Sequence, residues 1–227
     1  EGGNLGATQA GRIEFALAGG RIFTDAIDNS AGVDCSDHEV NIKIWLDTEV
    51  NAGKLPEADR NRVLNEMTGD VEELVLRDNT QQTHLLTREV QAQSNGSVVD
   101  SYAALITSLE AEGAVSRELE QLPLDAELQR RKANGAGLTA PELAVVVANV
   151  KNRFKRVLAS LPLIEEPWAD TVLRPYFPAQ LVATRDPLDH PLANAILATV
   201  LANEAVNRCG PLMIRDLAAE HRVDEAE

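Results

Sequence analysis

Apolar residues recur every three or four positions through most of the chain, which is the spacing of one face of an α-helix. The longest such stripe runs from Leu143 through Val150 to Leu161. It follows Thr139-Ala140-Pro141-Glu142, where Thr and Glu three residues apart have the pattern of a capping box. We therefore predict a helix over 139–161. A second segment, 189–209, is apolar nearly all round, which predicts a helix in the core.

Glycines, prolines and short polar runs separate the helical segments from one another. The remaining helices are predicted at 8–18, 32–50, 57–67, 70–93, 98–112, 125–132 and 212–221, with shorter ones at 116–121 and 168–176. Residues 21–25 follow a glycine pair and form a short strand candidate. The fold class predicted is mainly α, a helical domain that follows a short remnant of a Rossmann-like α/β domain, one helix plus one short strand.

The charge balance argues against a nucleic-acid-binding protein. The chain of 227 residues has 36 acidic and 21 basic side chains and a net charge of −15, whereas binding to a nucleic-acid backbone needs clustered Lys and Arg. No apolar run approaches the length of a membrane span. The two cysteines, Cys35 and Cys209, make no disulfide framework, so a reducing compartment is expected. We thus expect a cytoplasmic protein without nucleic-acid or membrane partners.

The first residues contain no initiator Met, no basic region and no signal-like apolar core. They form the glycine-rich run Glu1-Gly2-Gly3-Asn4, which could let backbone amides approach a cofactor closely. The run lacks the spacing of a dinucleotide-binding loop, so by pattern alone a plain turn is the simpler interpretation. We expect this chain to be a fragment of a longer polypeptide.

The densest polar cluster lies at 28–39. Asp34 and His38 at i, i+4 could hold a metal, but metal sites need three or four ligands. Cys35 and His38 could form a nucleophile pair, but a thiolate needs an oriented base. We therefore assign neither a metal nor a catalytic residue here. A third interpretation fits better: a turn of small residues opens a helix and brings free N–H groups near the Ser36 hydroxyl, an arrangement that suits a carboxylate or amide ligand.

Several of these residues resemble known motifs. Glu1-Gly2-Gly3-Asn4, followed by Asn29-Ser30-Ala31-Gly32-Val33 and Ser36, resembles the E-G-[AG]-N loop and the N-[AS]-[GA]-G-V-x-x-S turn of the glutamate dehydrogenase superfamily. The longer strings at 25–44, 138–144 and 190–208 resemble its large bacterial NAD-specific branch. The resemblance spans nearly the whole chain and is weakest over 55–135.

This resemblance implies an oxidoreductase of amino-acid catabolism that converts L-glutamate, NAD and water to 2-oxoglutarate, ammonia and NADH. It implies that Asn4 and Asn29 bind the nicotinamide–ribose end of the cofactor NAD. Val33 and Ser36 would line the pocket for the side-chain carboxylate of the substrate. An amide can hydrogen-bond ribose hydroxyls, and a hydroxyl can donate to a carboxylate.

The family's chemistry also needs a lysine of lowered pKa, a proton-shuttling acid and a strand–glycine turn–helix unit for the cofactor. None of these matches a segment of this chain. We therefore expect residues 1–50 to be the C-terminal part of a dinucleotide-binding domain and residues 51–227 to be a helical C-terminal domain. The chain should be inactive without the remainder of its parent polypeptide, and we expect a homo-oligomer. The alternative is a non-catalytic helical module for regulation or oligomerisation.

Overall fold

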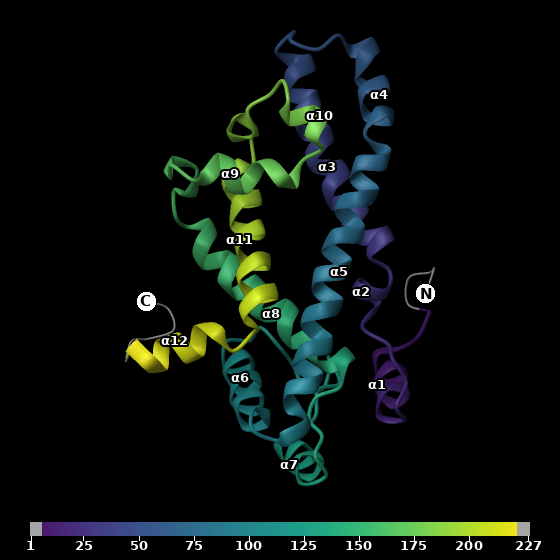
Figure 1. Ribbon diagram of the computed structural model, residues 1–227, viewed down its shortest axis with the longest axis vertical. Helices are drawn as coiled ribbons and strands as arrows, with labels where there is room; N and C mark the ends of the chain where they lie inside the picture. The colour runs from purple at the N-terminus through teal and green to yellow at the C-terminus, as the bar shows by residue number, and fades with distance from the viewer. Residues whose placement is uncertain (1–5, 222–227) are drawn as a thin grey trace. The chain divides into compact units, whose positions relative to one another are not determined.

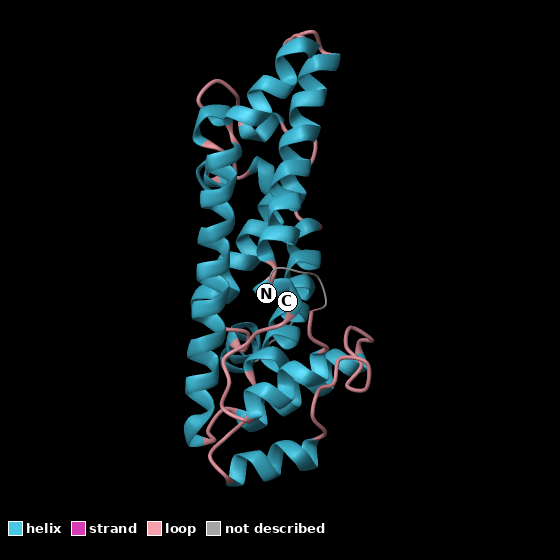
Figure 2. Ribbon diagram, turned by 90° about the vertical axis from the view of Figure 1, so that its right-hand side faces the viewer, coloured by secondary structure: helices cyan, strands magenta, loops and turns pink. Residues whose placement is uncertain are grey.

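The computed structural model describes residues 6–221, and all regular structure in that range is helical (Figures 1 and 2). The mainly α prediction is therefore confirmed. The chain divides into two compact units. Unit 1 draws on 1–29, 81–154 and 203–227, and unit 2 consists of 30–80 and 155–202. The predicted division at residue 50 concerns domains of a parent fold, and it stays a prediction.

Unit 1 has its own apolar core, built from the helical stripes that the sequence predicts. Tyr102, Ile106 and Leu109 are fully buried there against Leu143 and Val146. The helices that contribute to unit 1, wholly or in part, are α1 (Gln9–Leu17), α2 (Asp25–Asp28), α5 (Thr68–Ala92), η1 (Gln93–Asn95), α6 (Val99–Ala111), α7 (Asp125–Ala133), α8 (Ala140–Ala159), α11 (Ala193–Cys209) and α12 (Met213–His221).

The capping box predicted at the start of α8 is present, with its hydrogen bonds arranged differently from the expected ones. The backbone N–H and the hydroxyl of Thr139 both donate to Oε2 of Glu142, each at 2.7 Å. Glu142 therefore satisfies the orphan amide just before the helix, as a capping box requires. The Thr139 hydroxyl acts as a donor to the carboxylate, whereas in a standard capping box it accepts from the backbone N–H three residues later.

The strand expected at 21–25 is absent from the described residues. Residues 20–24 have no regular structure, and α2 begins at Asp25. The Phe23 N–H donates to Oδ2 of Asp28 at 3.1 Å, and the Phe23 carbonyl accepts from Nη1 of Arg12 at 3.0 Å. Because side chains satisfy this backbone, the segment forms no ladder with a neighbouring strand. The structure thus does not confirm the Rossmann-like remnant.

The prediction of a short helix at 116–121 is also wrong, since this segment forms a turn. The turn ends at Gln121, whose φ of 57° lies in the left-handed region. The guanidinium of Arg117 donates from Nε to Glu110 at 2.7 Å and from Nη1 to the Pro123 carbonyl at 2.6 Å. The buried side chain of Arg117 therefore stabilises the turn. The spacing of apolar residues gives no sign of these contacts.

Unit 2 has a second core, with aromatic side chains near its centre. Trp45 and Phe177 pack edge to face with their ring centroids 4.9 Å apart, and Leu46, Leu173 and Leu197 are fully buried around them. The further helices of unit 2 are α3 (Ser30–Asn51), α4 (Glu57–Glu66), η2 (Leu163–Glu165), α9 (Ala169–Leu173), η3 (Arg174–Tyr176), α10 (Ala179–Val182) and η4 (Pro187–Asp189).

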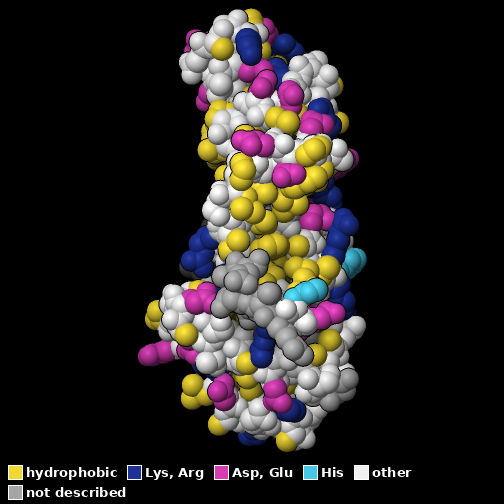
Figure 3. Space-filling model, turned by 90° about the vertical axis from the view of Figure 1, so that its left-hand side faces the viewer, with side chains coloured by type: hydrophobic (Ala, Val, Ile, Leu, Met, Phe, Trp, Pro, Cys, Tyr) yellow, Lys and Arg dark blue, Asp and Glu magenta, His cyan; other side chains and the backbone are white. Residues whose placement is uncertain are grey.

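The surface shown in Figure 3 carries hydrophobic side chains among charged ones. In unit 2 several large apolar side chains remain partly exposed, among them Leu161, Ile164 and Trp168. Within residues 6–221, no helix combines the length and the apolar character needed to cross a membrane.

Candidate functional site

Helix α3 carries most of the predicted site residues. Val33, Ser36 and Val40 follow one another at i, i+3 and i+7, so they share one face of the helix. All three are exposed, and the two valines retain 44% and 51% of their accessible surface. The structure therefore brings Val33 and Ser36 together, with the Ser36 hydroxyl between two exposed apolar side chains.

The turn of small residues that we expected before the helix is itself the first turn of α3. The helix begins at Ser30, and Ser36 lies in its second turn. The N–H groups without intrahelical partners belong to the first four residues of a helix. Ser36 therefore offers its hydroxyl, while its own N–H is part of the helix. Ser30 is buried, and its Oγ accepts from Nδ2 of Asn79 at 2.5 Å.

The structure does not fix the positions of the two predicted cofactor-binding residues, Asn4 and Asn29, relative to Ser36. Asn29 follows α2 as its C-cap residue, and its N–H donates to the Asp25 carbonyl at 2.8 Å. It belongs to unit 1, whereas Val33 and Ser36 belong to unit 2. Asn4 lies outside the described residues. The predicted contacts of both asparagines with NAD therefore stay predictions.

The opposite face of α3 contributes to a partly buried polar group, which we name the His38 cluster: Asp34, His38, Asp78 and Tyr176. Nε2 of His38 lies 3.3 Å from Oδ2 of Asp78, a residue of α5. The imidazole is 4.6 Å from the Tyr176 ring, centroid to centroid. The Tyr176 hydroxyl accepts from Nδ2 of Asn41 at 2.7 Å. Helix α3 thus has an exposed face with Ser36 and a buried face with His38.

The electrostatics of the His38 cluster differ between its two carboxyl groups. Burial raises the pKa of Asp34 to about 6, and the neighbouring Asp78 adds to the shift while His38 opposes it. Burial also acts to raise the pKa of Asp78, but hydrogen bonds from His38 and Arg77 outweigh it and hold that pKa below its usual value. Burial raises the pKa of Tyr176 to about 12.

Sequence analysis missed Asp78 and Tyr176 as neighbours of His38. They lie 40 and 138 positions further along the chain (78 − 38 and 176 − 38), and no local motif marks either residue. The sequence alternative of a Cys35–His38 pair finds no support. Nε2 of His38 faces Asp78, and Cys35 packs against the apolar core of unit 2.

Two family comparisons match separate parts of this chain. Residues 1–89 match the family described as bacterial NAD-glutamate dehydrogenase, catalytic domain. Residues 135–227 match the family described as glutamate dehydrogenase, C-terminal. The segment between them, 90–134, falls within the range 55–135 for which the sequence resemblance is weakest.

Three curated relatives share the name NAD-specific glutamate dehydrogenase. The protein of Mycobacterium tuberculosis is 46% identical over 213 residues, which cover 92% of this chain and 13% of the relative. That of Halomonas elongata is 42% identical over 229 residues, covering 100% and 14%. That of Pseudomonas aeruginosa is 42% identical over 222 residues, covering 96% and 13%. This chain therefore spans about one seventh of the length of these relatives.

Proposed function

Since this chain belongs to the bacterial NAD-specific glutamate dehydrogenase family, we propose that it is one portion of an enzyme that oxidatively deaminates L-glutamate with NAD. Residues 1–50 would complete the dinucleotide-binding domain, as a remnant of a Rossmann-like fold, and residues 51–227 would form the helical C-terminal domain. The products are 2-oxoglutarate, ammonia and NADH. A cytoplasmic homo-oligomer is part of the same proposal.

The observation that carries this proposal is the exposed face of α3. The Ser36 hydroxyl can donate a hydrogen bond to a carboxylate, and a donor to an ionised acceptor forms one of the stronger hydrogen bonds. Val33 and Val40 lie within two turns of it and are both exposed. Such apolar side chains suit the two methylene groups of a glutamate side chain, because their burial releases water. We propose that this face forms one wall of the substrate pocket.

In the proposal, Asn4 and Asn29 bind the nicotinamide–ribose end of NAD. An asparagine amide carries both donors and an acceptor, so it can bind ribose hydroxyls or the nicotinamide carboxamide. NAD would supply the hydride acceptor, and these side chains would hold its nicotinamide–ribose end. Positioning of this kind lowers the entropic part of the barrier. The lysine and the acid that move protons are expected from the remainder of the parent polypeptide.

The test replaces Ser36 by Ala in a polypeptide of the full length of the relatives. Loss of one hydrogen bond to a charged group should raise the KM for glutamate by roughly 10-fold or more, with little change in the KM for NAD. Thr48→Ala is the matched control, since Thr48 is an exposed hydroxyl residue of the same helix. Steady-state NADH formation measures both.

Unchanged kinetics in Ser36→Ala would contradict the substrate role and favour a non-catalytic helical module. A second measurement uses the 227-residue chain alone, with glutamate and NAD. We expect no NADH, because the chain lacks a segment that matches the family's proton-transfer lysine. NADH production by this chain would show that the reaction needs no further segment.

A further inference from the structure

We propose that Asp34, His38 and Asp78 bind one divalent transition-metal cation, of the chemical class of Zn²⁺, which links α3 to α5 within unit 2. The site uses the buried face of α3, whereas the proposed substrate contact uses the exposed face around Ser36. This inference therefore stands or falls independently of the proposed function.

The geometry brings three potential ligands together from two helices. Asp34 and His38 are separated by one helical turn, so they project from the same face of α3. Asp78 approaches from α5, and one ligand atom of each residue lies within 4.8 Å of the other two. Ligands about 2.1 Å from a tetrahedral zinc ion lie roughly 3 to 4 Å apart. Small side-chain rotations would close this set around a cation.

Two atoms of this group are buried without a hydrogen-bond partner. They are Oδ2 of Asp34 and Nδ1 of His38, and the His38 side chain is only 2% exposed. Buried polar groups normally have partners, because an unsatisfied one loses its hydration without compensation. The Asp34 oxygen offers a free lone pair, and the imidazole would bind the cation through Nε2, the nitrogen that faces Asp78, rather than through Nδ1. The orphaned Asp34 oxygen points to a cation.

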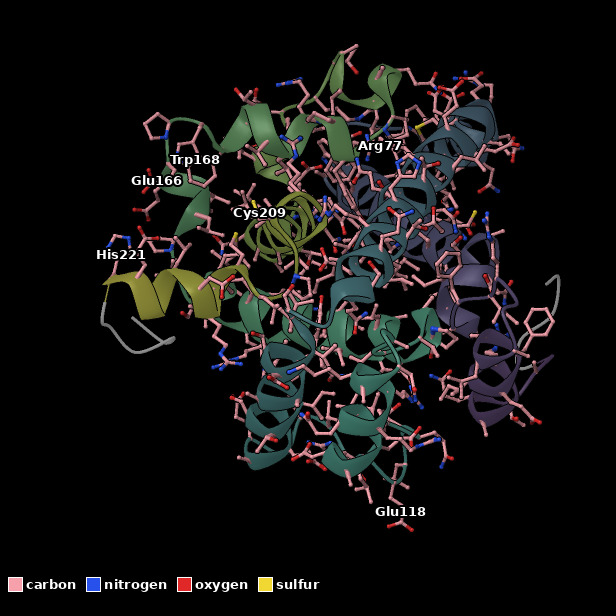
Figure 4. The ribbon with its side chains drawn as sticks, turned by 60° about the horizontal axis from the view of Figure 1, so that its bottom comes forward. Arg77, Glu118, Glu166, Trp168, Cys209 and His221 are labelled. Carbon is pink, nitrogen blue, oxygen red and sulfur yellow. The ribbon has the colours of Figure 1, made fainter. Side chains whose placement is uncertain are left out.

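The surrounding charges orient the ligands. Nε of Arg77 donates to Oδ1 of Asp78 at 3.1 Å, which leaves Oδ2 directed at His38 (Arg77 is labelled in Figure 4). Hydrogen bonds of this outer kind hold ligating carboxylates in place. Asp34 and Asp78 repel each other in a half-buried setting, and Asp37 adds to that repulsion at Asp34. A divalent cation would offset the repulsion more fully than the single charge of Arg77.

The types of donor atom indicate which metals would bind at this site. Calcium takes six to eight oxygen ligands and magnesium keeps several waters, whereas one imidazole with two carboxylates suits Zn²⁺, Co²⁺ or Mn²⁺. Three protein ligands leave a fourth position for water. The competing occupant is a proton shared among the same three groups, which would need no metal.

The experiment titrates the chelator-stripped 227-residue chain with Zn²⁺ by calorimetry and with Co²⁺ by visible absorption. We expect one site per chain, cobalt d–d bands of a low-coordinate ion, and a higher melting temperature with Zn²⁺. Asp34→Asn and Asp78→Asn should each weaken binding by about 10-fold or more, because each removes a ligand. Glu39→Gln is the matched control, since Glu39 is an exposed acid on the same helix; it should bind as the unmodified chain does.

Absence of the cobalt bands in the unmodified chain would overturn the proposal, and this readout depends on no variant. Equal weakening in all three variants would also overturn it, since a chain with a net charge of −15 can collect cations diffusely on its surface. Circular dichroism checks that each variant is folded. If Asp78→Asn fails to fold, the weakening in Asp34→Asn is compared with that in Glu39→Gln, and equal weakening in these two variants overturns the proposal.

Discussion

Arg131 and Glu142 form a buried ion pair in unit 1, with Nη1 of the arginine 2.8 Å from Oε2 of the glutamate. Their side chains are 9% and 1% exposed. The same Oε2 accepts both hydrogen bonds from Thr139. One carboxylate oxygen thus completes the capping box of α8 and fastens that helix to α7.

Arg131→Met should strongly destabilise unit 1. It leaves Glu142 buried without its cation, and breaking a buried pair in this way costs about 3 to 5 kcal/mol. Arg130→Met is the control, because Arg130 is 72% exposed and pairs with Glu127 at the surface. The free energy of unfolding in urea measures both. Similar losses in the two variants would contradict the structural role of the Arg131–Glu142 pair.

Gly137→Ala should also destabilise the chain. An added Cβ would lie 2.2 Å from Oε1 of Gln93, which cannot move freely because it accepts from the Leu138 N–H at 2.7 Å while Nε2 donates to the Leu138 carbonyl. Overpacking of this kind costs about 1 to 3 kcal/mol. In Gly69→Ala the new Cβ meets no heavy atom within 4 Å, so that helix position should lose no stability. Thermal unfolding of the two variants tests the contrast.

His190 should make unit 2 less stable below neutral pH. Its Nε2–H donates to the Asn41 carbonyl and its Nδ1 accepts from the Leu192 N–H, each at 2.9 Å. The Nδ1 bond requires the neutral ring, whereas Nε2–H can donate in either state; burial lowers the pKa of His190 and outweighs the Asn41 hydrogen bond, which acts to raise it. The unfolded chain, with a pKa near 6.5, therefore binds a proton before the folded chain does. The stabilisation is complete above that pH and is lost as the pH falls below it.

The measurement is the free energy of unfolding between pH 5 and 8, a range that brackets the ordinary histidine pKa of about 6.5. His190→Gln should remove part of the pH dependence in the acidic half of that range. His84→Gln is the control, since His84 is exposed and should leave the dependence unchanged. An identical profile for His190→Gln and the unmodified chain would show that this ring does not contribute.

Asp28→Asn should loosen the segment before α3. Oδ2 of Asp28 accepts from Nη1 of Arg12 at 2.7 Å and from the Phe23 N–H at 3.1 Å. Weakening these bonds beside the buried Arg12 should cost about 1 to 3 kcal/mol and speed hydrogen exchange at the Phe23 amide. Glu14→Gln, an exposed change in α1, should leave that exchange rate unaltered.

Periodicity and capping signals predicted most helices well. Helix 57–67 was expected and Glu57–Glu66 is found; helix 98–112 was expected and Val99–Ala111 is found. These signals succeed because helical hydrogen bonds join residues four apart. The strand at 21–25 fails for the opposite reason, since a strand needs a partner that is distant in sequence. Here Arg12 and Asp28 satisfy the Phe23 backbone instead.

The sequence by itself determined the two faces of α3. A turn of 3.6 residues places Val33 and Ser36 on one face and Asp34 and His38 on another, whatever surrounds the helix. The family resemblance likewise rests on residues that are close in sequence. Only the tertiary structure decided which face is buried and that Asp78 lies against His38. The physical reason is that packing brings these groups together across 40 residues, and no local pattern encodes that distance.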